Sequence, residues 1–113
     1  MITSILTSIK QLLGITKDDT SFDDVIIMHI NRAFVALNDL GVGPIDGYRI
    51  TSDMETWNDY LGDSKNLDDV QTYVYLKVKM VFDPPLSQSH INAIKEDIKE
   101  LEWRLNVRVD KEG

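Results

Sequence analysis

Four carboxylates lie close together near the start of the sequence, where they are candidates for binding a metal ion: Asp18, Asp19, Asp23 and Asp24. A calcium-binding loop needs acids at alternating positions, a glycine at its middle and a closing glutamate, and this segment lacks that pattern. The two histidines, His29 and His90, also lie outside the HExxH pattern of zinc sites. We therefore predict no metal site, and we expect the four acids to serve in helix capping and in a solvated turn.

A second group of carboxylates is a candidate for general acid and base catalysis: Glu96, Asp97, Glu100 and Glu102. Lys95 and Lys99 are interleaved with these acids, which is typical of the solvated face of a helix. The segment Gly41-Val42-Gly43 follows a helical pattern and precedes Pro44, whereas a phosphate-binding loop leads into a helix N-terminus. The sequence also has no nucleophile elbow. It therefore predicts no catalytic residue, no cofactor and no enzyme activity.

Three aromatic residues are candidates for contact with another protein: Trp57, Tyr60 and Trp103. The first two lie beside a glycine-rich region, where loops often carry binding residues. The third falls outside the apolar stripe of its predicted helix. Trp and Tyr dominate the energetics of protein interfaces, but they also cover the edges of small cores. The sequence leaves both interpretations open.

The composition is that of an ordinary globular protein. The chain has 113 residues, which is the size of one domain, and 42% of them are hydrophobic. It contains no cysteine, which excludes a disulfide framework and a thiolate metal site. We find no pattern of a signal peptide and no apolar run approaching the roughly 20 residues that span a membrane. We therefore expect a protein that is made and kept in a cytoplasm, with no membrane contact.

The charge balance is acidic, with 19 acidic and 12 basic residues and a formal net charge of −7. Tight nucleic-acid binding depends on Lys and Arg side chains that neutralise phosphates. Along the sequence, the basic residues are scattered among acids: Arg32, Arg49, Lys77, Lys79, Lys95, Lys99, Arg104 and Arg108. The sequence therefore argues against nucleic-acid binding as the main function.

Helical spacing of apolar residues predicts two helices in the first 44 residues. The first ends at Gly14, and its apolar face consists of Ile2, Ile5, Leu6, Ile9, Leu12 and Leu13. The second runs from about residue 25 to residue 40, and Thr20 or Ser21 is its expected N-cap, in a carboxylate variant of the capping box. Its stripe is expected to form the centre of the core and consists of Ile26, Ile30, Ala33, Leu37 and Leu40, widened by Ile27 and Phe34.

The middle of the chain is less regular. Glycine and proline predict turns over 41–56, with one short extended piece over 48–51. A single helical turn follows over 55–61, and Asn66 is expected to cap another helix. Residues 74–82 match both a strand and a helix, because apolar residues occupy alternate positions there. The cap, the length of the run and the lack of a partner strand favour the helix.

Ser87 or Ser89 is expected to cap the last helix, whose apolar seam consists of Ile91, Ile94, Ile98, Leu101 and Leu105. Residues 106–109 then alternate polar and apolar types, which predicts an extended tail over 106–113 or a frayed terminus. The whole pattern predicts an all-α fold. We expect a small bundle of about four to five helices in a single domain over 1–113, with an irregular Gly/Pro-containing middle loop.

Two blocks of the sequence carry a resemblance to a known family. The N-terminal block is Leu12-Leu13-Gly14-Ile15, the acidic turn, Ile30-Asn31-Arg32-Ala33-Phe34 and Leu40-Gly41-Val42-Gly43-Pro44. The later block is Tyr73-Val74-Tyr75-Leu76-Lys77-Val78, Phe82-Asp83-Pro84-Pro85 and Glu100-Leu101-Glu102-Trp103-Arg104-Leu105-Asn106. In order, length and spacing, both resemble the small head–tail connector (adaptor, neck) proteins of tailed bacteriophages, which sit beneath the portal. The resemblance covers most of the chain, and no single motif carries it.

The resemblance implies a structural function in virion assembly. Such connectors are small helical bundles, and about a dozen copies form a homo-oligomeric ring. The ring extends the portal channel, contacts the portal protein and the next neck or tail-completion protein, and lets DNA pass through without specific binding. The protein would lie in the virion neck, at the head–tail interface, after synthesis in the cytoplasm of the host bacterium.

The C-terminal end of such connectors commonly reaches toward the portal. This adds residues near that end to the candidate interface, which then consists of Trp57, Tyr60, Trp103, Val107, Arg108 and Val109. Two other classes of function stay open. One is a small helical regulator that binds a partner through the 91–105 seam, and the other is a cryptic enzyme that uses His29 or the acids.

Overall fold

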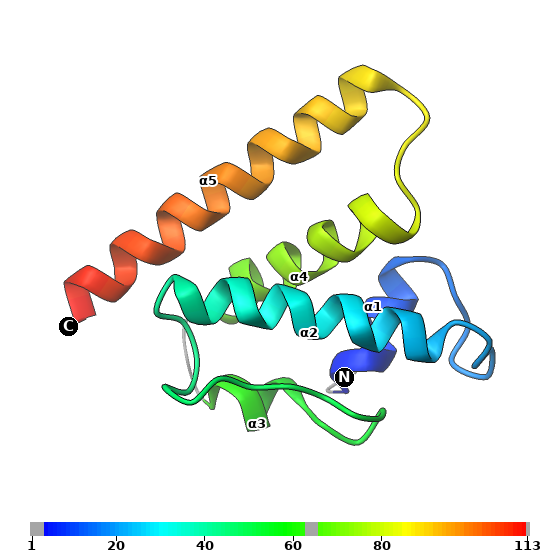
Figure 1. The fold of residues 1–113 in the computed structure, drawn as a ribbon, viewed down its shortest axis with the longest axis horizontal. Coiled ribbons are helices and arrows are strands. Elements are labelled where there is room, and N and C mark those ends of the chain that lie inside the picture. Colours follow the sequence, from blue (N-terminus) through cyan, green and yellow to red (C-terminus); the bar gives the residue numbers. More distant parts are fainter. Residues whose placement is uncertain (1–3, 63–65, 113) are drawn as a thin grey trace.

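The computed structural model describes residues 4–62 and 66–112, and within these ranges it contains five helices and no strand. The helices are α1 (Ile5–Leu12), α2 (Asp23–Asp39), α3 (Trp57–Leu61), α4 (Leu67–Phe82) and α5 (Gln88–Glu112). Figure 1 shows α2 in the middle of the molecule, α5 above it, and α3 with its preceding loop below. The predicted all-α fold is confirmed for these residues. Ile2, which the predicted first helix included, lies outside them.

The centre of the fold is formed by α2 and α4, which pack against each other and against α1, while α5 packs against α4. The predicted stripe of α2 is confirmed at its buried members, Ile26, Ile30, Ala33, Phe34 and Leu37. Since residues 74–82 are helical, the strand alternative is wrong. Because α4 contacts α1, α2 and α5, it is covered on more than one side. Residues on different sides of the helix, such as Val74, Leu76 and Val78, are therefore all buried, and their apolar types give the alternating pattern.

Glycine ends α2 as predicted. Gly41 adopts a φ of +88°, in the left-handed region that favours glycine. The Val42 N–H donates to the Leu37 carbonyl at 2.9 Å, and the Gly41 N–H donates to the Asn38 carbonyl at 3.0 Å. These bonds form a Schellman motif, which satisfies the last carbonyls of the helix and turns the chain toward the middle loop.

The N-terminus of α2 differs from the prediction. Phe22 occupies the N-cap position without a side-chain hydrogen bond. Neither Thr20 nor Ser21 caps the helix, because the Ser21 N–H donates to Asp19 Oδ1 at 3.1 Å in a turn of its own. Several polar side chains in this turn can accept from the same backbone N–H groups. The residue types alone therefore do not show which residue occupies the N-cap position.

A capping box occurs instead at α3. The Asp59 N–H donates to Thr56 Oγ1, and the Thr56 N–H donates to Asp59 Oδ2, each at 3.0 Å. This confirms the predicted helical turn and explains why so short a helix starts at Trp57. The same segment is tied to the N-terminal part of the chain, since the Ile5 N–H donates to the Glu55 carbonyl at 3.0 Å.

The last two helices begin where predicted. Asn66 immediately precedes α4, although its side chain makes no capping hydrogen bond. Ser87 immediately precedes α5, and its hydroxyl lies 3.4 Å from the His90 N–H.

The C-terminal segment is helical to Glu112, so the predicted extended tail over 106–113 is wrong for residues 106–112. Tertiary contacts hold this part of α5. Arg108 Nη1 lies 2.6 Å from Asp69 Oδ2, and Asn106 Nδ2 donates to the Leu40 carbonyl at 3.3 Å. Val109 packs against the core four residues after Leu105. In a helix these two residues share one face, which the polar-apolar alternation conceals.

One polar side chain is buried unexpectedly. The sequence pattern places Lys10 off the apolar face of the first helix, but its side chain is only 4% exposed. Its ammonium lies 2.8 Å from Asp23 Oδ1 and donates to the Lys17 carbonyl at 3.2 Å. This ion pair joins the end of α1 to the start of α2.

Candidate functional site

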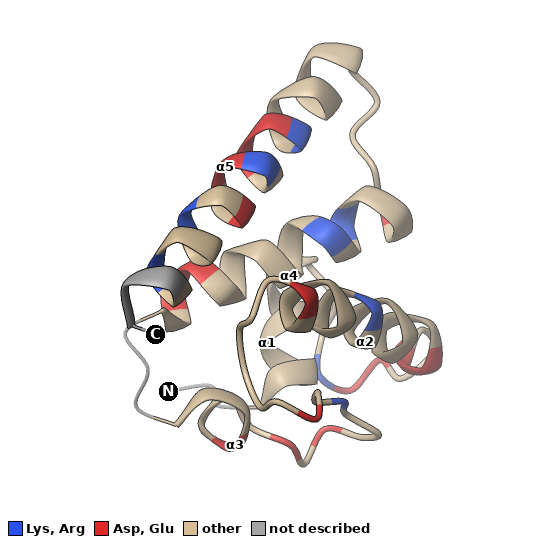
Figure 2. Cartoon of the chain, turned by 60° about the vertical axis from the view of Figure 1, so that its left-hand side comes forward, with Lys and Arg blue, Asp and Glu red and all other residues tan. Residues whose placement is uncertain are grey.

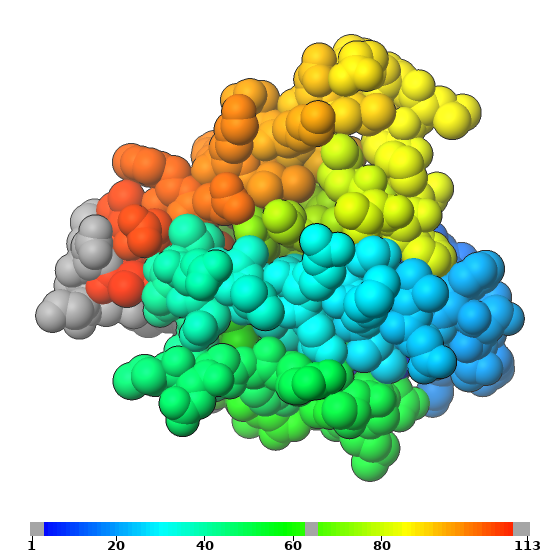
Figure 3. Space-filling model, in the orientation of Figure 1, coloured from blue at the N-terminus to red at the C-terminus, as the bar shows by residue number. Residues whose placement is uncertain are grey.

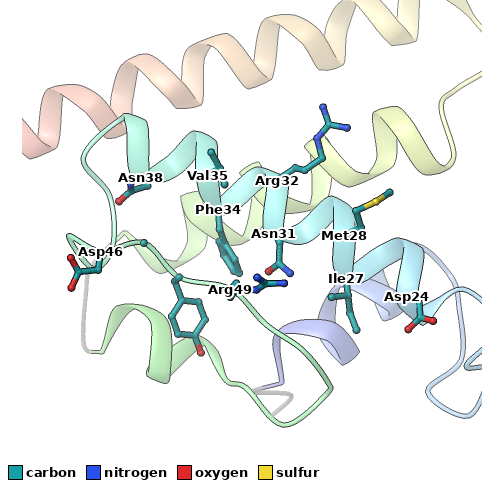
Figure 4. Close-up of a pocket in the computed structure, with 12 residues that line it drawn as sticks. Asp24, Ile27, Met28, Asn31, Arg32, Phe34, Val35, Asn38, Asp46 and Arg49 are labelled. Atoms are coloured by element: carbon teal, nitrogen blue, oxygen red, sulfur yellow. The ribbon is translucent and has the colours of Figure 1, made fainter.

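A groove of about 820 Å³ lies between α2 and the loop over 46–49 (Figure 4). Ile27, Met28 and Val35 contribute apolar surface on the α2 side. Asp24 and Asn38 lie at its two ends along α2, as Figure 4 shows. Exposed apolar side chains among polar ones are typical of a surface that contacts another protein. The groove therefore suits contact, and its shape depends on how the loop is held.

Asn31 holds the loop against α2. Its Nδ2 donates to the Ile50 carbonyl at 2.9 Å, and the Ile50 N–H donates to its Oδ1 at 2.7 Å. Ile50 is fully buried, so these bonds satisfy backbone groups that water does not reach. The predicted extended piece over 48–51 forms no strand, because its backbone pairs with this side chain instead of another strand.

A carboxylate orders the far end of the loop. Glu55 accepts hydrogen bonds from the backbone N–H and the hydroxyl of both Thr51 and Ser52, at 2.8 to 3.2 Å. Burial alone would raise the pKa of Glu55, but the hydrogen bonds outweigh it and hold that pKa below its usual range. The charged form that predominates at neutral pH therefore fixes the loop.

Trp57 and Tyr60, two of the predicted interface residues, are buried beneath this loop. Trp57 Nε1 donates to Ser8 Oγ at 2.8 Å, and the Tyr60 ring lies 4.5 Å, between centroids, from that of Phe34. Gly43 lies over the same ring with a φ of +89°, and a Cβ there would come within 2.6 Å of Tyr60 Cε1. Both aromatic side chains therefore fill the core of the chain, which is one of the two interpretations that the sequence left open.

The four C-terminal candidates differ in exposure and in their contacts within the chain. Trp103 is 68% exposed on α5 and stays available for contact. Arg108 is held by Asp69 and also donates to Asn66 Oδ1 at 3.0 Å. Val107 and Val109 are half-buried, and Val109 approaches Gly41 at the end of α2. The structure thus uses Arg108 and Val109 within the chain and leaves Trp103 facing solvent.

The 91–105 seam faces α4 of the same chain. Leu101 and Leu105 are buried, and Ile94 and Ile98 are partly buried against the core. Of the acids on this helix, Glu96, Asp97 and Glu100 are exposed, as predicted for a solvated face. Glu102 is half-buried and accepts a hydrogen bond from the Tyr73 hydroxyl at 2.7 Å. Burial, together with this carboxylate, raises the pKa of Tyr73.

The histidines lie apart from each other. His29 is half-buried on α2, and desolvation together with the charge of Arg32 lowers its pKa. His90 is exposed in the first turn of α5. Over residues 4–62 and 66–112, no group of three or more His, Cys, Asp or Glu side chains could hold a metal ion. Nor is any helix in these ranges long and apolar enough to cross a membrane.

Basic residues do gather in the folded chain, contrary to what the sequence indicated. Arg32 of α2, Lys77 of α4, and Lys95 and Lys99 of α5 line one cleft of about 440 Å³, which we call the basic cleft. Figure 2 shows the basic residues of α4 and α5 in this part of the molecule. Sequence reasoning missed the site because its residues come from three helices. A signal was available in the i,i+4 spacing of the two α5 lysines.

The comparison with protein families assigns a family to almost the whole chain. Residues 5–112 match the family described as Phage connector protein, and this range runs from the start of α1 to the end of α5. Neither curated proteins nor solved structures gave a match. Because the match includes every described helix, it concerns the complete fold, and we conclude that the chain belongs to the phage connector protein family.

Proposed function

We propose that this protein is a head–tail adaptor that forms a ring beneath the portal of a tailed phage. In this function the ring extends the DNA channel, contacts the portal protein on one side and receives the next neck or tail-completion protein on the other. The protein acts structurally rather than as an enzyme, and it resides in the virion neck. Membership of the phage connector family supports this proposal.

The family match over residues 5–112 is the observation that carries the proposal, and the exposed apolar side chains are compatible with it. Ile45 and Met54, in the loop below α2, are 95% and 79% exposed. Leu86 is fully exposed before α5, and Trp103 is exposed along that helix. Single exposed apolar residues are common on protein surfaces, but these four are available for contact with several neighbours. A ring subunit has two neighbouring copies besides the proteins above and below it.

The charge supports passage of DNA without binding. The formal net charge of −7 gives a ring of these subunits an acidic overall character. Such a ring repels phosphates rather than neutralising them, so it does not hold the genome in place.

The regulator that would bind a partner helix through the 91–105 seam is less well supported. Leu101 and Leu105 are buried in the chain's own core, and Ile98 packs against it. A partner helix would have to displace α4 to reach these side chains.

Deletion of the gene in a phage that carries it tests the proposal directly. We expect heads and tails that fail to join, with infectivity restored when the intact gene is supplied on a plasmid. Native mass spectrometry of isolated necks should show about a dozen copies in one closed ring. Normal joined particles in the absence of the protein would overturn the proposal.

Trp103 provides a sharper test of attachment. Trp103→Ser removes an exposed side chain, so the free energy of unfolding should change by less than about 0.5 kcal/mol. Attachment to heads should nevertheless fall, because exposed Trp residues are frequent anchors of interfaces. Glu96→Ser is the matched control, since Glu96 is also exposed on α5. Equal attachment by both variants would exclude Trp103 from the contact surface.

A further inference from the structure

The basic cleft has an apolar floor and a positively charged rim. It lies between α2 and α5, which diverge in Figure 1, and Figure 3 shows α4 between them. Ala33, Met80, Val81 and Ile98 contribute apolar surface to it. The described lining residues include four cations and a single carboxylate, Glu102, which already accepts the Tyr73 hydroxyl. A concentration of positive charge is notable in a chain whose net charge is −7.

The chain itself leaves most of these cations unneutralised. Among the described residues, no carboxylate forms an ion pair with Arg32, Lys77 or Lys95. Lys77 lies 5.9 Å from the centroid of the Tyr73 ring, and Lys99 makes only a long, exposed contact of 3.7 Å with Glu96. The cleft therefore has the charge to bind a group with acids of its own.

The floor of the cleft distinguishes between two kinds of acidic partner. A nucleic-acid backbone would use the cations but not the apolar surface of Met80 and Val81, and the rest of the chain would repel it. In a protein segment that carries both acids and apolar side chains, the acids would pair with the cations of the rim and the apolar side chains would contact the floor. The cleft therefore fits an acidic peptide segment with one or two projecting apolar residues.

The loop over 44–54 of this chain has that composition. Ile45 and Met54 are its most exposed apolar side chains, and each is next to an exposed acid, Asp46 and Asp53 respectively. No described cation forms an ion pair with either acid. Asn31 and Glu55 hold the loop in one shape, so little conformational entropy would be lost on docking.

The loop and the cleft lie on different sides of the molecule. Figure 1 shows the loop below α2 and the cleft-forming α5 above it, so one copy cannot fill its own cleft. Two different surfaces that fit each other produce a head-to-tail contact, which closes into a ring when the rotation between copies allows it. Copies that each carry a net charge of −7 repel one another, so a local contact of opposite charge is needed at their boundary.

We infer that the loop over 44–54 of one copy docks in the basic cleft of the next copy. In this contact Met54 and Ile45 lie on the apolar floor, while Asp46 and Asp53 pair with the cations of the rim. The inference rests on the proposed ring and names the surfaces by which its subunits recognise each other.

Cysteine cross-linking tests the contact cleanly, because the chain contains no cysteine. Met54→Cys and Val81→Cys are combined in one chain, incorporated into phage necks and oxidised. We expect a ladder of covalent multimers on a denaturing gel, whereas either single variant gives dimers at most. Met54→Cys with Thr72→Cys is the control pair, since Thr72 is exposed on α4 and lines neither the basic cleft nor the pocket that contains Asp53. An assembled ring that gives no ladder would overturn the docking contact and leave the ring intact, while wild-type necks without a ring would overturn both.

Charge exchange provides an independent measurement. Lys95→Glu with Lys99→Glu should lower the yield of assembled necks about tenfold or more, since several like charges then face each other. Adding Asp46→Lys and Asp53→Lys to the same chain should restore assembly, and circular dichroism checks that each variant is folded. If the lysine changes leave assembly intact and instead abolish retardation of duplex DNA by the wild-type protein, the occupant is nucleic acid and the inference is wrong.

Discussion

Replacing Asn31 by alanine should detach the loop from α2. The change removes both hydrogen bonds to Ile50, and it leaves the N–H and carbonyl of a fully buried residue without a partner. Each bond contributes about 1 kcal/mol net, and each unsatisfied buried group costs about 1 to 3 kcal/mol. We therefore expect Asn31→Ala to lower the free energy of unfolding by about 2 to 4 kcal/mol. For a domain of this size the melting temperature should fall by about 10 °C or more.

Urea denaturation, calorimetry and amide hydrogen exchange measure the effect. Exchange at the Ile50 amide should become fast in the variant, because its hydrogen-bond acceptor is gone. Asn38→Ala is the matched control, since Asn38 is on the same helix, lines the same groove and is exposed. It should change stability by less than about 0.5 kcal/mol. If Asn31→Ala were as stable as Asn38→Ala, the two hydrogen bonds between Asn31 and Ile50 would contribute nothing to stability, which would refute this prediction.

Three further perturbations have distinct expected outcomes. Asp23→Asn should destabilise by about 3 kcal/mol and Lys10→Met by only about 1 kcal/mol, because the lysine left behind is 4% exposed and the aspartate 24%; equal losses on urea denaturation would contradict this. Gly43→Ala should cost about 3 kcal/mol and Gly47→Ala about 1 kcal/mol, since both have positive φ but only the first would push a Cβ into a buried tyrosine ring. The lowered pKa of Glu55 implies stability that is complete above its unfolded pKa, near 4.5, and is lost as pH falls through the folded value. The free energy of unfolding of wild type should therefore exceed that of Glu55→Gln by a smaller amount below about pH 4.5 than above it. A difference that stays constant from about pH 6 to about pH 3 would show that Glu55 does not make stability depend on pH.

The helices were predictable because each needs only a periodic apolar face and a stop signal. The stripe from Ile26 to Leu37 and the glycine at position 41 are local features, and the structure places them as the sequence indicates. The ambiguity over 74–82 had a physical origin. A helix buried on several sides loses the polar face that separates it from a strand.

Features that depend on contacts distant in sequence were not predictable. Lys10 is buried because Asp23 meets it across a turn, and the end of α5 is helical because Asp69 holds Arg108. The sequence left both a surface and a core position open for Trp57 and Tyr60, and only the folded loop that covers them decides for the core. The basic cleft exists only once three helices are assembled.

The attachment of α5 has a mechanical consequence. The helix has 25 residues, so it is about 37 Å long at 1.5 Å per residue. It is anchored most firmly in its C-terminal half, where Leu101 and Leu105 are buried and Arg108 is paired with Asp69. The distance along the helix from Leu105 to Ile91 is about 21 Å, so a rotation of about 10° about Leu105 would move Ile91 by about 4 Å. Such a rotation would widen or narrow the basic cleft and would let a ring subunit fit neighbours at slightly different spacings while Leu101 and Leu105 stay buried.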